Sequence, residues 1–413
     1  MKFNLIEVKA LNEYPVHNLD TGLNYTAIQE AIDAPQTLDG HTILVDTGTY
    51  YERAIVNKTL NLIGQSRSTV IDGNETSAPF VVEASNVTIK GFTIRGCNNT
   101  VFDQFASGIK VFGNNTTITQ NNIKSNFYGI FVWSSKNLIF NNSVFDNKYG
   151  IFLDNSNNVV SGNEIRANGD GIRISWSTLN TIVCNNILLN FRYGVSCYHS
   201  SNNMLYFNNF INNNVHAGAL RWSCSNSWDN GYPSGGNFWN GYSGFDLSSG
   251  QFQHENGSDG IGDSPYGILN DNQDNYPLMG MFSDFNTSLG YDVNVISNST
   301  IKNFEYFESN STIRMYVSNM TVNQTFGFVR ICIPHALMDE TYHIAIDGAE
   351  PYYVNYTLYD NSTHRWIYFS YQHSTLEIII IPEFPSFLVL PLFMIATLLA
   401  IIVYRRKHTV RQI

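Results

Sequence analysis

The chain has 413 residues, enough for two or three domains, and only 14% of them are charged, against ~25% in typical soluble proteins. Its formal net charge of −11 argues against a nucleic-acid partner, because phosphate binding requires clustered Lys and Arg. Neutral amides and hydroxyls supply the solubility that the missing charges do not, which suits a surface exposed outside the cell.

Cysteine and asparagine usage fits the same location. No pair of the five cysteines has CxxC spacing, so neither a zinc site nor a redox motif is indicated, and the odd number leaves at least one unpaired or paired with another chain. Acceptor sequences of the form N-x-S/T are frequent, as expected of a glycosylated exterior. They include Asn24, Asn57, Asn74, Asn86, Asn298, Asn310, Asn319, Asn355 and Asn361.

The first 21 residues contain no apolar segment long enough to form the core of a signal peptide. Either the true start of the protein lies upstream, or translocation uses a different signal. We favour the first interpretation and assign residues 1–21 to a leader of unclear role.

From about residue 22 to residue 280 the chain is organised by a repeat. A Gly-aliphatic pair recurs at spacings of 21, 21, 21 and 23 residues. The pairs are Gly108-Ile109, Gly129-Ile130, Gly150-Ile151, Gly171-Ile172 and Gly194-Val195. Short aliphatic alternations, none longer than about five residues, are bounded by Asn, Gly or Ser, which is typical of strands. Three short strands and three turns per repeat predict one coil of a solenoid.

Two Asn positions keep the same register through five consecutive repeats. The first set is Asn121, Asn142, Asn163, Asn185 and Asn208, and the second is Asn126, Asn147, Asn168, Asn190 and Asn213. Asn tolerates left-handed backbone angles in turns, and stacked side-chain amides bond to one another along a solenoid axis. We therefore expect Asn ladders at the turns and stacked aliphatic side chains inside.

This repeat resembles the parallel β-helix repeats of the NosD-like and pectin-lyase-like superfamily, also called carbohydrate-binding and sugar-hydrolase repeats. Residues 25–32 (YTAIQEAI) and 43–65 resemble that family's capping helix and first coil, and GNFW, DGIGDSPY and DNYPLM within residues 236–279 resemble its C-terminal end in archaeal surface proteins. The resemblance implies an all-β, right-handed single-stranded parallel β-helix over residues 22–280. It implies little about activity, since the superfamily includes lyases, hydrolases, epimerases and proteins with no known reaction.

The strand after each Gly-aliphatic pair alternates inward aliphatic residues with outward ones. Exposed aromatic side chains on one face mark binding surfaces, and sugar rings stack on such faces. We predict a carbohydrate-binding surface at Phe112, Phe131, Trp133, Phe152 and Tyr198. Asp154 and Arg173 on the same face are expected to hold hydroxyls or a uronate carboxylate. In the alternative, an inserted loop at residues 98–107 covers the rings.

A polysaccharide lyase or hydrolase on the same scaffold is the alternative function. A glycosidase needs two carboxylates at the scissile bond, and Asp154 and Asp170 lie on adjacent coils. A lyase needs calcium on an acidic cluster and an Arg or Lys base, and apart from Lys110 the candidate base on this face is Arg173. Because the sequence motifs of polygalacturonases and epimerases are absent, we favour binding over a reaction.

Residues 255–263 (ENGSDGIGD) resemble acidic calcium-binding loops. Glu255, Asp259 and Asp263 supply three oxygen positions and the Ile261 carbonyl supplies another, and hard cations prefer such oxygens. Gly257 occupies the central acidic position, so a turn that closes the helix is the alternative. His and Met residues do not cluster, so the sequence gives copper no support.

Residues 281–381 lack the repeat and contain longer alternating runs such as STIRMYVS and FGFVRICIP. This pattern predicts an antiparallel β-sandwich, which resembles the membrane-proximal module of archaeal surface proteins and is expected to act as a stalk.

The segment 384–404 is apolar and uncharged, and at 1.5 Å per residue its length matches the ~30 Å core of a bilayer. Arg405, Arg406 and Lys407 follow directly, so the positive-inside rule places the tail 405–413 in the cytoplasm. The sequence therefore predicts a single transmembrane helix, a mostly extracellular chain, and a polysaccharide or cell-envelope glycan as partner.

Overall fold

The computed structural model describes residues 13–75, 77–98, 105–220, 224–269, 272–338, 342–372 and 374–382. The chain divides into two units, Met1–Ser283 and Asp284–Ile413. Within the described ranges no helix is long and apolar enough to cross a membrane. The predicted transmembrane segment 384–404 and the basic tail 405–413 lie outside these ranges.

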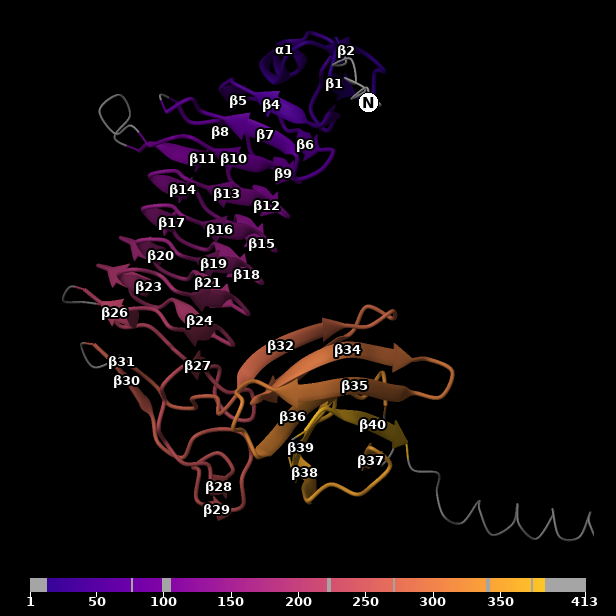
Figure 1. The fold of residues 1–413 in the computed structure, drawn as a ribbon. Helices are drawn as coiled ribbons and strands as arrows, with labels where there is room; N and C mark the ends of the chain where they lie inside the picture. Colours follow the sequence, from indigo (N-terminus) through magenta and orange to yellow (C-terminus); the bar gives the residue numbers. More distant parts are fainter. Residues whose placement is uncertain are drawn as a thin grey trace, which may run out of the picture. The chain divides into compact units, whose positions relative to one another are not determined.

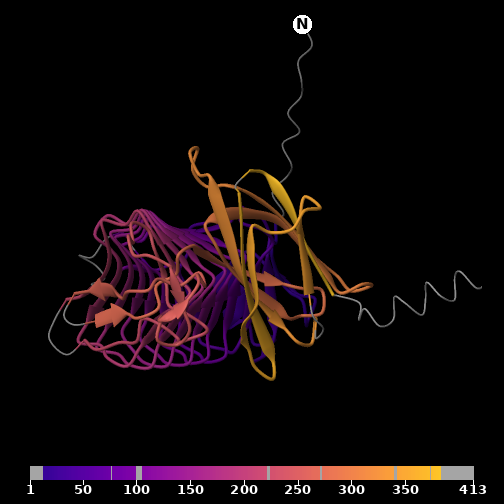
Figure 2. The same cartoon turned by 90° about the horizontal axis from the view of Figure 1, so that it is seen from below.

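The first unit is a right-handed parallel β-helix of about eight coils, as predicted (Figure 1). Three sheets run along its axis, and Figure 2 shows the successive coils superposed, with their turns in rows. The parallel register follows the sequence repeat, since Ile130 pairs with Ile109 on one side and with Ile151 on the other.

Each coil contributes one strand to each sheet. Sheet A contains β1 (Val16–Asn18), β2 (Asn24–Tyr25), β3 (Thr42–Val45), β6 (Asn61–Gly64), β9 (Thr88–Lys90), β12 (Thr117–Thr119), β15 (Leu138–Phe140), β18 (Val159–Ser161), β21 (Thr181–Val183) and β24 (Met204–Tyr206). Sheet B contains β4 (Gly48–Tyr50), β7 (Thr69–Asp72), β10 (Thr93–Arg95), β13 (Asn122–Lys124), β16 (Ser143–Phe145), β19 (Glu164–Arg166), β22 (Asn186–Leu188), β25 (Asn209–Ile211) and β27 (Phe238–Trp239). Sheet C contains β5 (Ala54–Val56), β8 (Phe80–Val82), β11 (Ser107–Val111), β14 (Tyr128–Val132), β17 (Tyr149–Leu153), β20 (Asp170–Ser175), β23 (Tyr193–Tyr198) and β26 (Val215–Ala219).

The Gly of each Gly-aliphatic pair is required by close packing between coils. A Cβ atom on Gly150 would lie 2.5 Å from the Gly171 carbonyl oxygen and 3.1 Å from Nδ2 of Asn168. The aliphatic partner of each Gly is fully buried in the interior, as predicted for Ile109, Ile130 and Ile151. The pair therefore marks the point where the chain passes closest to its neighbouring coil.

Three Asn ladders, rather than the two predicted, join the coils. In the first, Nδ2 of Asn142 donates to Oδ1 of Asn163 at 3.0 Å, and Nδ2 of Asn163 donates to Oδ1 of Asn185 at 2.9 Å. The second ladder repeats this pattern from Asn126 to Asn213. In the third ladder, each backbone N–H donates to Oδ1 of the next Asn along Asn137, Asn158, Asn180, Asn203 and Asn226.

The backbone at the turns differs from the sequence interpretation. The left-handed residue is the one before each ladder Asn, for example Ala167 at φ 51° and Leu189 at φ 55°, whereas the ladder Asn itself is not left-handed. A left-handed residue redirects the chain so that the following side chain points inward. Asn is therefore required for its amide and not for its tolerance of positive φ.

Both ends of the β-helix are closed by specific contacts. At the start, α1 (Ile28–Asp33) buries Ile28 and Ile32 against the first coil, and the Glu52 carboxylate accepts the first N–H groups of the helix. At the other end, the Asp274 carboxylate accepts hydrogen bonds from the backbone of Asn237 at 2.7 Å and from Trp239 Nε1 at 2.8 Å. Two short hairpins complete this end, β28 (Ser248–Ser249) with β29 (Glu255–Asn256) and β30 (Tyr266–Ile268) with β31 (Asn272–Asp274).

The second unit is built from two antiparallel sheets that share one apolar core. The five-stranded sheet contains β32 (Met281–Asn286), β33 (Asp292–Ser297), β36 (Phe326–Pro334), β39 (His364–Gln372) and β38 (Tyr353–Asp360). The four-stranded sheet contains β34 (Ser299–Phe307), β35 (Thr312–Asn319), β40 (Leu376–Pro382) and β37 (Tyr342–Ile346). Core residues such as Val295 and Met315 come from opposite sheets, which makes this unit a β-sandwich.

The ladder makes a direct prediction at Asn163. Replacing Asn163 with Leu removes its bonds to Asn142 and Asn185 and leaves buried amides without partners. We expect the free energy of unfolding to fall by roughly 2–4 kcal/mol, measured by urea denaturation. The matched control is Asn122→Leu, because the Asn122 side chain makes no hydrogen bond to a described residue. Equal stability of the two variants would contradict the ladder.

Candidate functional site

The outward side of sheet C gathers the predicted site residues, and we call it the outer face. The residues that alternate with the interior side chains of these strands, such as Phe131, Phe152 and Arg173, are directed outward. Contacts with these three place Tyr128, Tyr149 and Asp170 on the same side. The outer face comprises Lys110, Phe112, Tyr128, Phe131, Trp133, Tyr149, Phe152, Asp154, Asp170, Arg173, Ser196 and Tyr198. Register places Phe131 beside Phe152, and Phe152 beside Arg173.

Phe131 does not lie open, so that part of the predicted binding surface was wrong. Phe105, at the end of the inserted segment, stacks on the Phe131 ring with centroids 4.8 Å apart. Tyr128 and Phe152 each lie 5.5 Å from the same ring, and Phe131 is only 1% exposed. Covering the ring removes its apolar area from water, so the alternative of loop cover holds at this position.

Phe112 and Trp133 remain open beside this covered cluster. They are 41% and 52% exposed, and their ring centroids are 6.1 Å apart. Phe105 also lies 6.1 Å from Trp133, so the open pair rests against packed rings. The arrangement provides two adjoining aromatic surfaces, held in place from below, that face solvent.

A charged cluster occupies the coils that follow. The Asp170 carboxylate is 1% exposed, accepts a hydrogen bond from Ser196 Oγ at 3.0 Å and lies 3.1 Å from Arg192 Nε. Arg173 Nη1 lies 4.0 Å from the same carboxylate. Two guanidinium groups thus share one carboxylate, and the side chain of Arg192 is 48% exposed.

Aromatic rings hold both arginines. The Arg173 guanidinium carbon lies 5.4 Å from the Tyr198 ring centroid and 5.7 Å from that of Phe152. Both Arg173 and Arg192 also lie over the Tyr149 ring, at 5.6 and 5.1 Å. Cation–π contacts of this kind restrict the guanidinium groups without neutralising them.

The predicted catalytic carboxylates are not brought together. Asp170 pairs in register with Tyr149, and Asp154 lies five residues further along that strand, which places the two roughly 16 Å apart. Glycosidases hold their carboxylates within about 9.5 Å of one another, so the expectation that Asp154 and Asp170 meet was wrong. Burial raises the pKa of Asp170, against the opposing effects of Arg192, Ser196 and Arg173. Burial also raises the pKa of Asp154.

The predicted calcium loop is organised by Asp246, which the sequence interpretation did not single out. Its carboxylate accepts the backbone N–H groups of Asp259 at 2.8 Å and Gly260 at 2.9 Å. The Asp259 carboxylate accepts the N–H of Ile261, and that of Asp263 accepts two backbone N–H groups of residues 247 and 248. These residues form a closing turn, so calcium binding at Glu255, Asp259, Ile261 and Asp263 stays a prediction.

Three contributors to the outer face were missed by the sequence interpretation. Phe105 lies in the inserted segment outside the repeat, and Arg192 lies in the turn before β23, where the coil has 23 residues rather than 21. The third is the row formed by the residue before each Gly. In this row the sequence interpretation had named Asp170 but not Tyr128 or Tyr149, although the repeat keeps all three in one register.

The two environments on the outer face predict losses of stability of different size on truncation. Phe131→Ala empties a covered site and is expected to lower the free energy of unfolding by roughly 3 kcal/mol. Trp133→Ala removes a ring that is half exposed and is expected to cost less than about 1 kcal/mol. Thermal and urea unfolding of the two variants decides the matter, and an equal loss in both would contradict the cover by Phe105.

Comparison with known proteins finds similarity to a cell surface protein over part of the chain. A stretch of 112 residues is 37% identical to a cell surface glycoprotein of Methanothermus fervidus. The stretch covers 27% of this chain and 18% of that protein. The chain thus matches about a fifth of the length of this curated relative.

Two solved structures resemble the fold at low similarity. The A-module of the mannuronan C-5 epimerase AlgE6 from Azotobacter vinelandii gives a TM-score of 0.31 at 16% identity, covering 45% of this chain and 71% of that one. The enzymatically active domain of tailspike protein 2 from bacteriophage CBA120 gives 0.33 at 12% identity, covering 81% of this chain and 75% of that one. At these scores neither likeness bears on activity.

Residues 36–244 match the family described as "Periplasmic copper-binding protein (NosD)". Among the described residues, no three His, Cys, Asp or Glu side chains gather where they would hold a metal ion, so the described part of the chain does not fit the copper of that description. The match nevertheless covers just over half of the chain and coincides with the coils of the β-helix. The chain therefore belongs to the NosD family.

Proposed function

We propose that this chain is a cell-surface protein that binds anionic glycans through the outer face of sheet C. The observation that carries the proposal is the joining, on one face, of an open aromatic pair and a pair of arginines that share a single carboxylate. The name of the Methanothermus fervidus relative supports an exterior location.

The aromatic part of the face suits the apolar sides of sugar rings. Phe112 and Trp133 offer adjoining ring surfaces, and the packed rings beneath hold them before any ligand arrives. A ligand that stacks there meets a surface that is already ordered, so little conformational entropy is lost on binding.

The charged part of the face suits a carboxylate or sulfate on the sugar. The two arginines and the single Asp170 carboxylate together carry one net positive charge. The guanidinium of Arg192 is the more exposed of the two and can present that charge to a ligand. Arginine binds carboxylates through two parallel N–H donors, and this geometry favours an anionic ligand over a hydroxyl.

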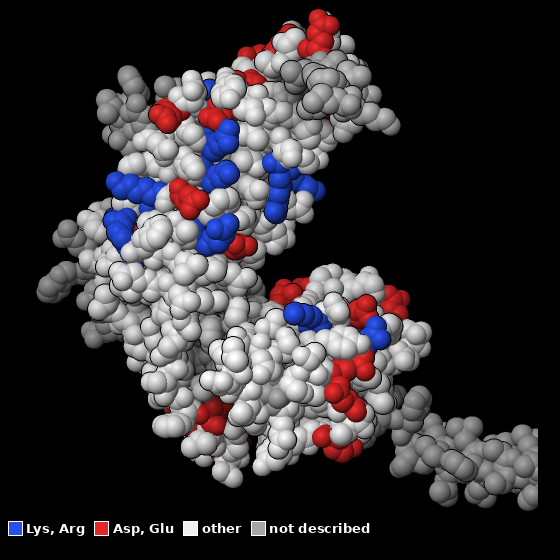
Figure 3. Space-filling view, viewed as in Figure 1, with Lys and Arg blue, Asp and Glu red and all other residues white. Residues whose placement is uncertain are grey.

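The charge of the middle coils of the β-helix points in the same direction. Residues 80–200 contain nine Lys and Arg against six Asp and Glu, although the full chain carries a net charge of −11. Figure 3 shows Lys and Arg gathered over the middle coils on one side of the β-helix. A long anionic ligand would be attracted to these coils and repelled by the acidic remainder of the chain.

The spacing of the coils suits a linear ligand that lies along the axis. Phe112, Trp133, Asp154, Ser175 and Tyr198 occupy equivalent positions in five consecutive coils. With ~4.8 Å between neighbouring strands, this row extends over roughly 19 Å. Successive sugar units would meet aromatic, carboxylate and hydroxyl groups in turn.

The alternative function, a polysaccharide lyase or hydrolase, has less support from the site. The Asp170 carboxylate is enclosed by Arg192, Arg173 and Ser196, and Asp154 lies too far from it to form an acid–base pair. A protein that only binds a glycan does not need the Asp154 or Asp170 carboxylate at a scissile bond.

Binding of an acidic polysaccharide tests the proposal. Arg192→Gln removes the exposed guanidinium but leaves Arg173 beside Asp170, so we expect affinity for polygalacturonate to fall about tenfold or more. The Phe112→Ala, Trp133→Ala double variant is expected to weaken binding to the same degree, because the stacking surface is lost. Isothermal titration on the purified chain measures both effects.

The control is Arg166→Gln on sheet B. Arg166 also lies over an aromatic ring, at 4.4 Å from Phe145, and also pairs with a carboxylate, at 2.7 Å from Glu164, but it is outside the outer face. The substitution changes the net charge by the same amount. Equal losses for Arg166→Gln and Arg192→Gln would contradict the assignment of the outer face, and so would wild-type protein that binds no acidic polysaccharide.

Attachment to the membrane through residues 384–404 belongs to the same proposal. The apolar, uncharged length of this segment and the basic residues after it support an anchor. We expect deletion of residues 384–413 to move the protein from the membrane fraction to the soluble fraction on cell fractionation. Retention in the membrane would show a different attachment.

A further inference from the structure

The second unit contains seven N-x-S/T acceptor sequences, and the hydrogen bonds of five of them fall into two groups. Their asparagines are Asn286, Asn298, Asn310, Asn319, Asn323, Asn355 and Asn361. A sugar attached to an asparagine is bonded to Nδ2, so the direction and surroundings of that nitrogen decide whether the folded protein has room for it.

In the first group, Nδ2 is turned toward the protein. Nδ2 of Asn286 donates to Asp292 Oδ1 at 2.7 Å. Nδ2 of Asn298 donates to the Phe326 carbonyl at 3.2 Å, and Nδ2 of Asn319 donates to the Gln324 carbonyl at 3.2 Å. A sugar on any of these nitrogens would have to displace the side chain from its bonded position.

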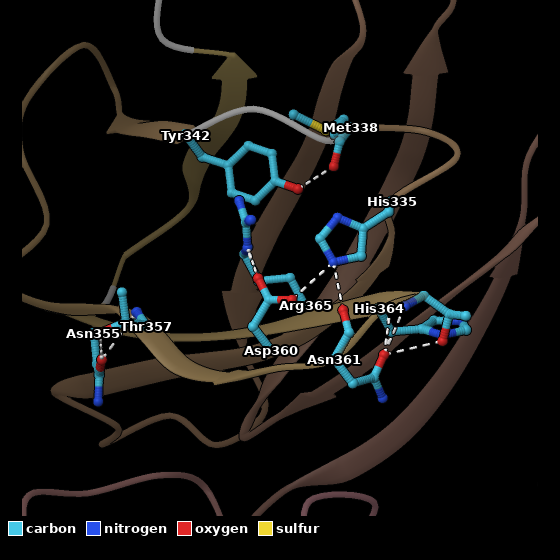
Figure 4. Close-up of polar contacts among 10 residues, drawn as sticks. His335, Met338, Tyr342, Asn355, Thr357, Asp360, Asn361, His364 and Arg365 are labelled. Carbon is cyan, nitrogen blue, oxygen red and sulfur yellow. Dashed lines mark hydrogen bonds and ion pairs between the residues drawn. The ribbon is translucent and has the colours of Figure 1, made fainter.

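Asn361 shows the opposite arrangement. Its Oδ1 accepts three hydrogen bonds, from Thr363 N at 2.9 Å, Thr363 Oγ1 at 3.0 Å and His364 N at 2.8 Å. Three donors around one atom identify that atom as the oxygen, so the nitrogen is the other one. Asn361 is exposed, and its Nδ2 makes no hydrogen bond to any residue that the structure describes. In Figure 4 this nitrogen points away from the bonded network.

The turn that carries Asn361 is held from behind. Nε2 of His335 lies 2.8 Å from Asp360 Oδ1 and 2.9 Å from the Asn361 carbonyl, and Arg365 also bonds the Asp360 carboxylate (Figure 4). Although burial raises the pKa of Asp360, the bonds from Arg365 and His335 outweigh this effect and lower it. The carboxylate therefore stays ionised at neutral pH and keeps the turn anchored.

Asn355 repeats the local arrangement at lower exposure. Its Oδ1 accepts the Thr357 N–H at 3.1 Å and the Thr357 hydroxyl at 3.5 Å, and Figure 4 shows its nitrogen directed away from these bonds. Asn355 is half-buried, whereas Asn361 stands at the tip of the hairpin between β38 and β39. The structure thus favours Asn361 over Asn355, and Asn361 is the acceptor whose turn is held from behind.

We propose that Asn361 is an N-glycosylation site of this protein. In the reaction, Nδ2 forms a bond to C1 of the first sugar of a lipid-linked oligosaccharide phosphate, and the C1–O bond to the phosphate breaks. The electron pair of that bond stays on the phosphate oxygen, and one amide proton passes to a base of the transferase. The product extends from a rigid turn into solvent, and the Thr363 bond to Oδ1 is retained.

Asn361→Asp tests the site with the least disturbance, because the carboxylate keeps the acceptor oxygen of the turn but offers no nitrogen. The full chain is exported in a host that glycosylates its own surface proteins, and the tryptic peptide 331–365 is examined by mass spectrometry. We expect most wild-type peptide to carry a glycan with fragments that place it at Asn361, and we expect that mass to disappear in Asn361→Asp. Thr363→Val is expected to abolish it as well, and Thr363→Ser to retain it.

Asn298→Asp is the matched control and is expected to leave the glycan content unchanged, because Asn298 belongs to the group turned toward the protein. Melting temperature is recorded for every variant, so that loss of the fold is separated from loss of the acceptor. An unmodified Asn361 in wild-type protein from a host with active glycosylation overturns the proposal. So does modification at Asn286, Asn298 or Asn319 with Asn361 empty.

Discussion

The β-helix depends on one repeated interaction, the hydrogen bond from an asparagine side chain to the amide of the asparagine in the next coil. Most ladder Asn side chains also donate to backbone carbonyls of their own or the preceding coil, as Asn163 does to Ser161 and Ile139. The interior is filled by aliphatic side chains, which offer no hydrogen-bond partner to the amides buried at the turns. The ladders satisfy those amides and set the coils in register at the same time, and the sheets and the outer face follow from that register.

The parts of the fold that repeat could be predicted from the sequence, whereas single contacts between the repeat and its surroundings could not. The Gly-aliphatic pair and two Asn positions recur at fixed spacing, so they revealed the coil and its inward side chains. The third ladder, from Asn137 to Asn226, has nearly the same spacing as the two predicted ladders, so it too was visible in the sequence although the interpretation did not include it. The left-handed residues could not be recognised by type, because Ala167 and Leu189 occupy positions where Gly or Asn is usual.

The outer face shows the same division. Strand alternation correctly directed Phe131 and Trp133 outward, but exposure depends on a side chain from another segment, and Phe105 covers only one of the two rings. Arg192 reaches Asp170 from a turn, so no strand pattern includes it. Covered rings and shared charges therefore serve as the support on which the open groups, Trp133 and Arg192, are displayed.

The first ladder also has a direction, and its end is chemically different from its steps. Every amide in it donates toward the C-terminal side, from Asn121 through Asn208 to Asn237, and the next acceptor is the buried Asp274 carboxylate. An amide both accepts and donates, so it passes the chain of bonds on, whereas the Asp274 carboxylate accepts from Asn237, Trp239 and Tyr276 and ends it. The bond between one ladder amide and the next is the same in every coil, so it does not fix the number of coils. The length of this ladder is thus an open variable, like the degree of polymerisation of a polymer, and the ladder ends where its last amide meets the Asp274 carboxylate.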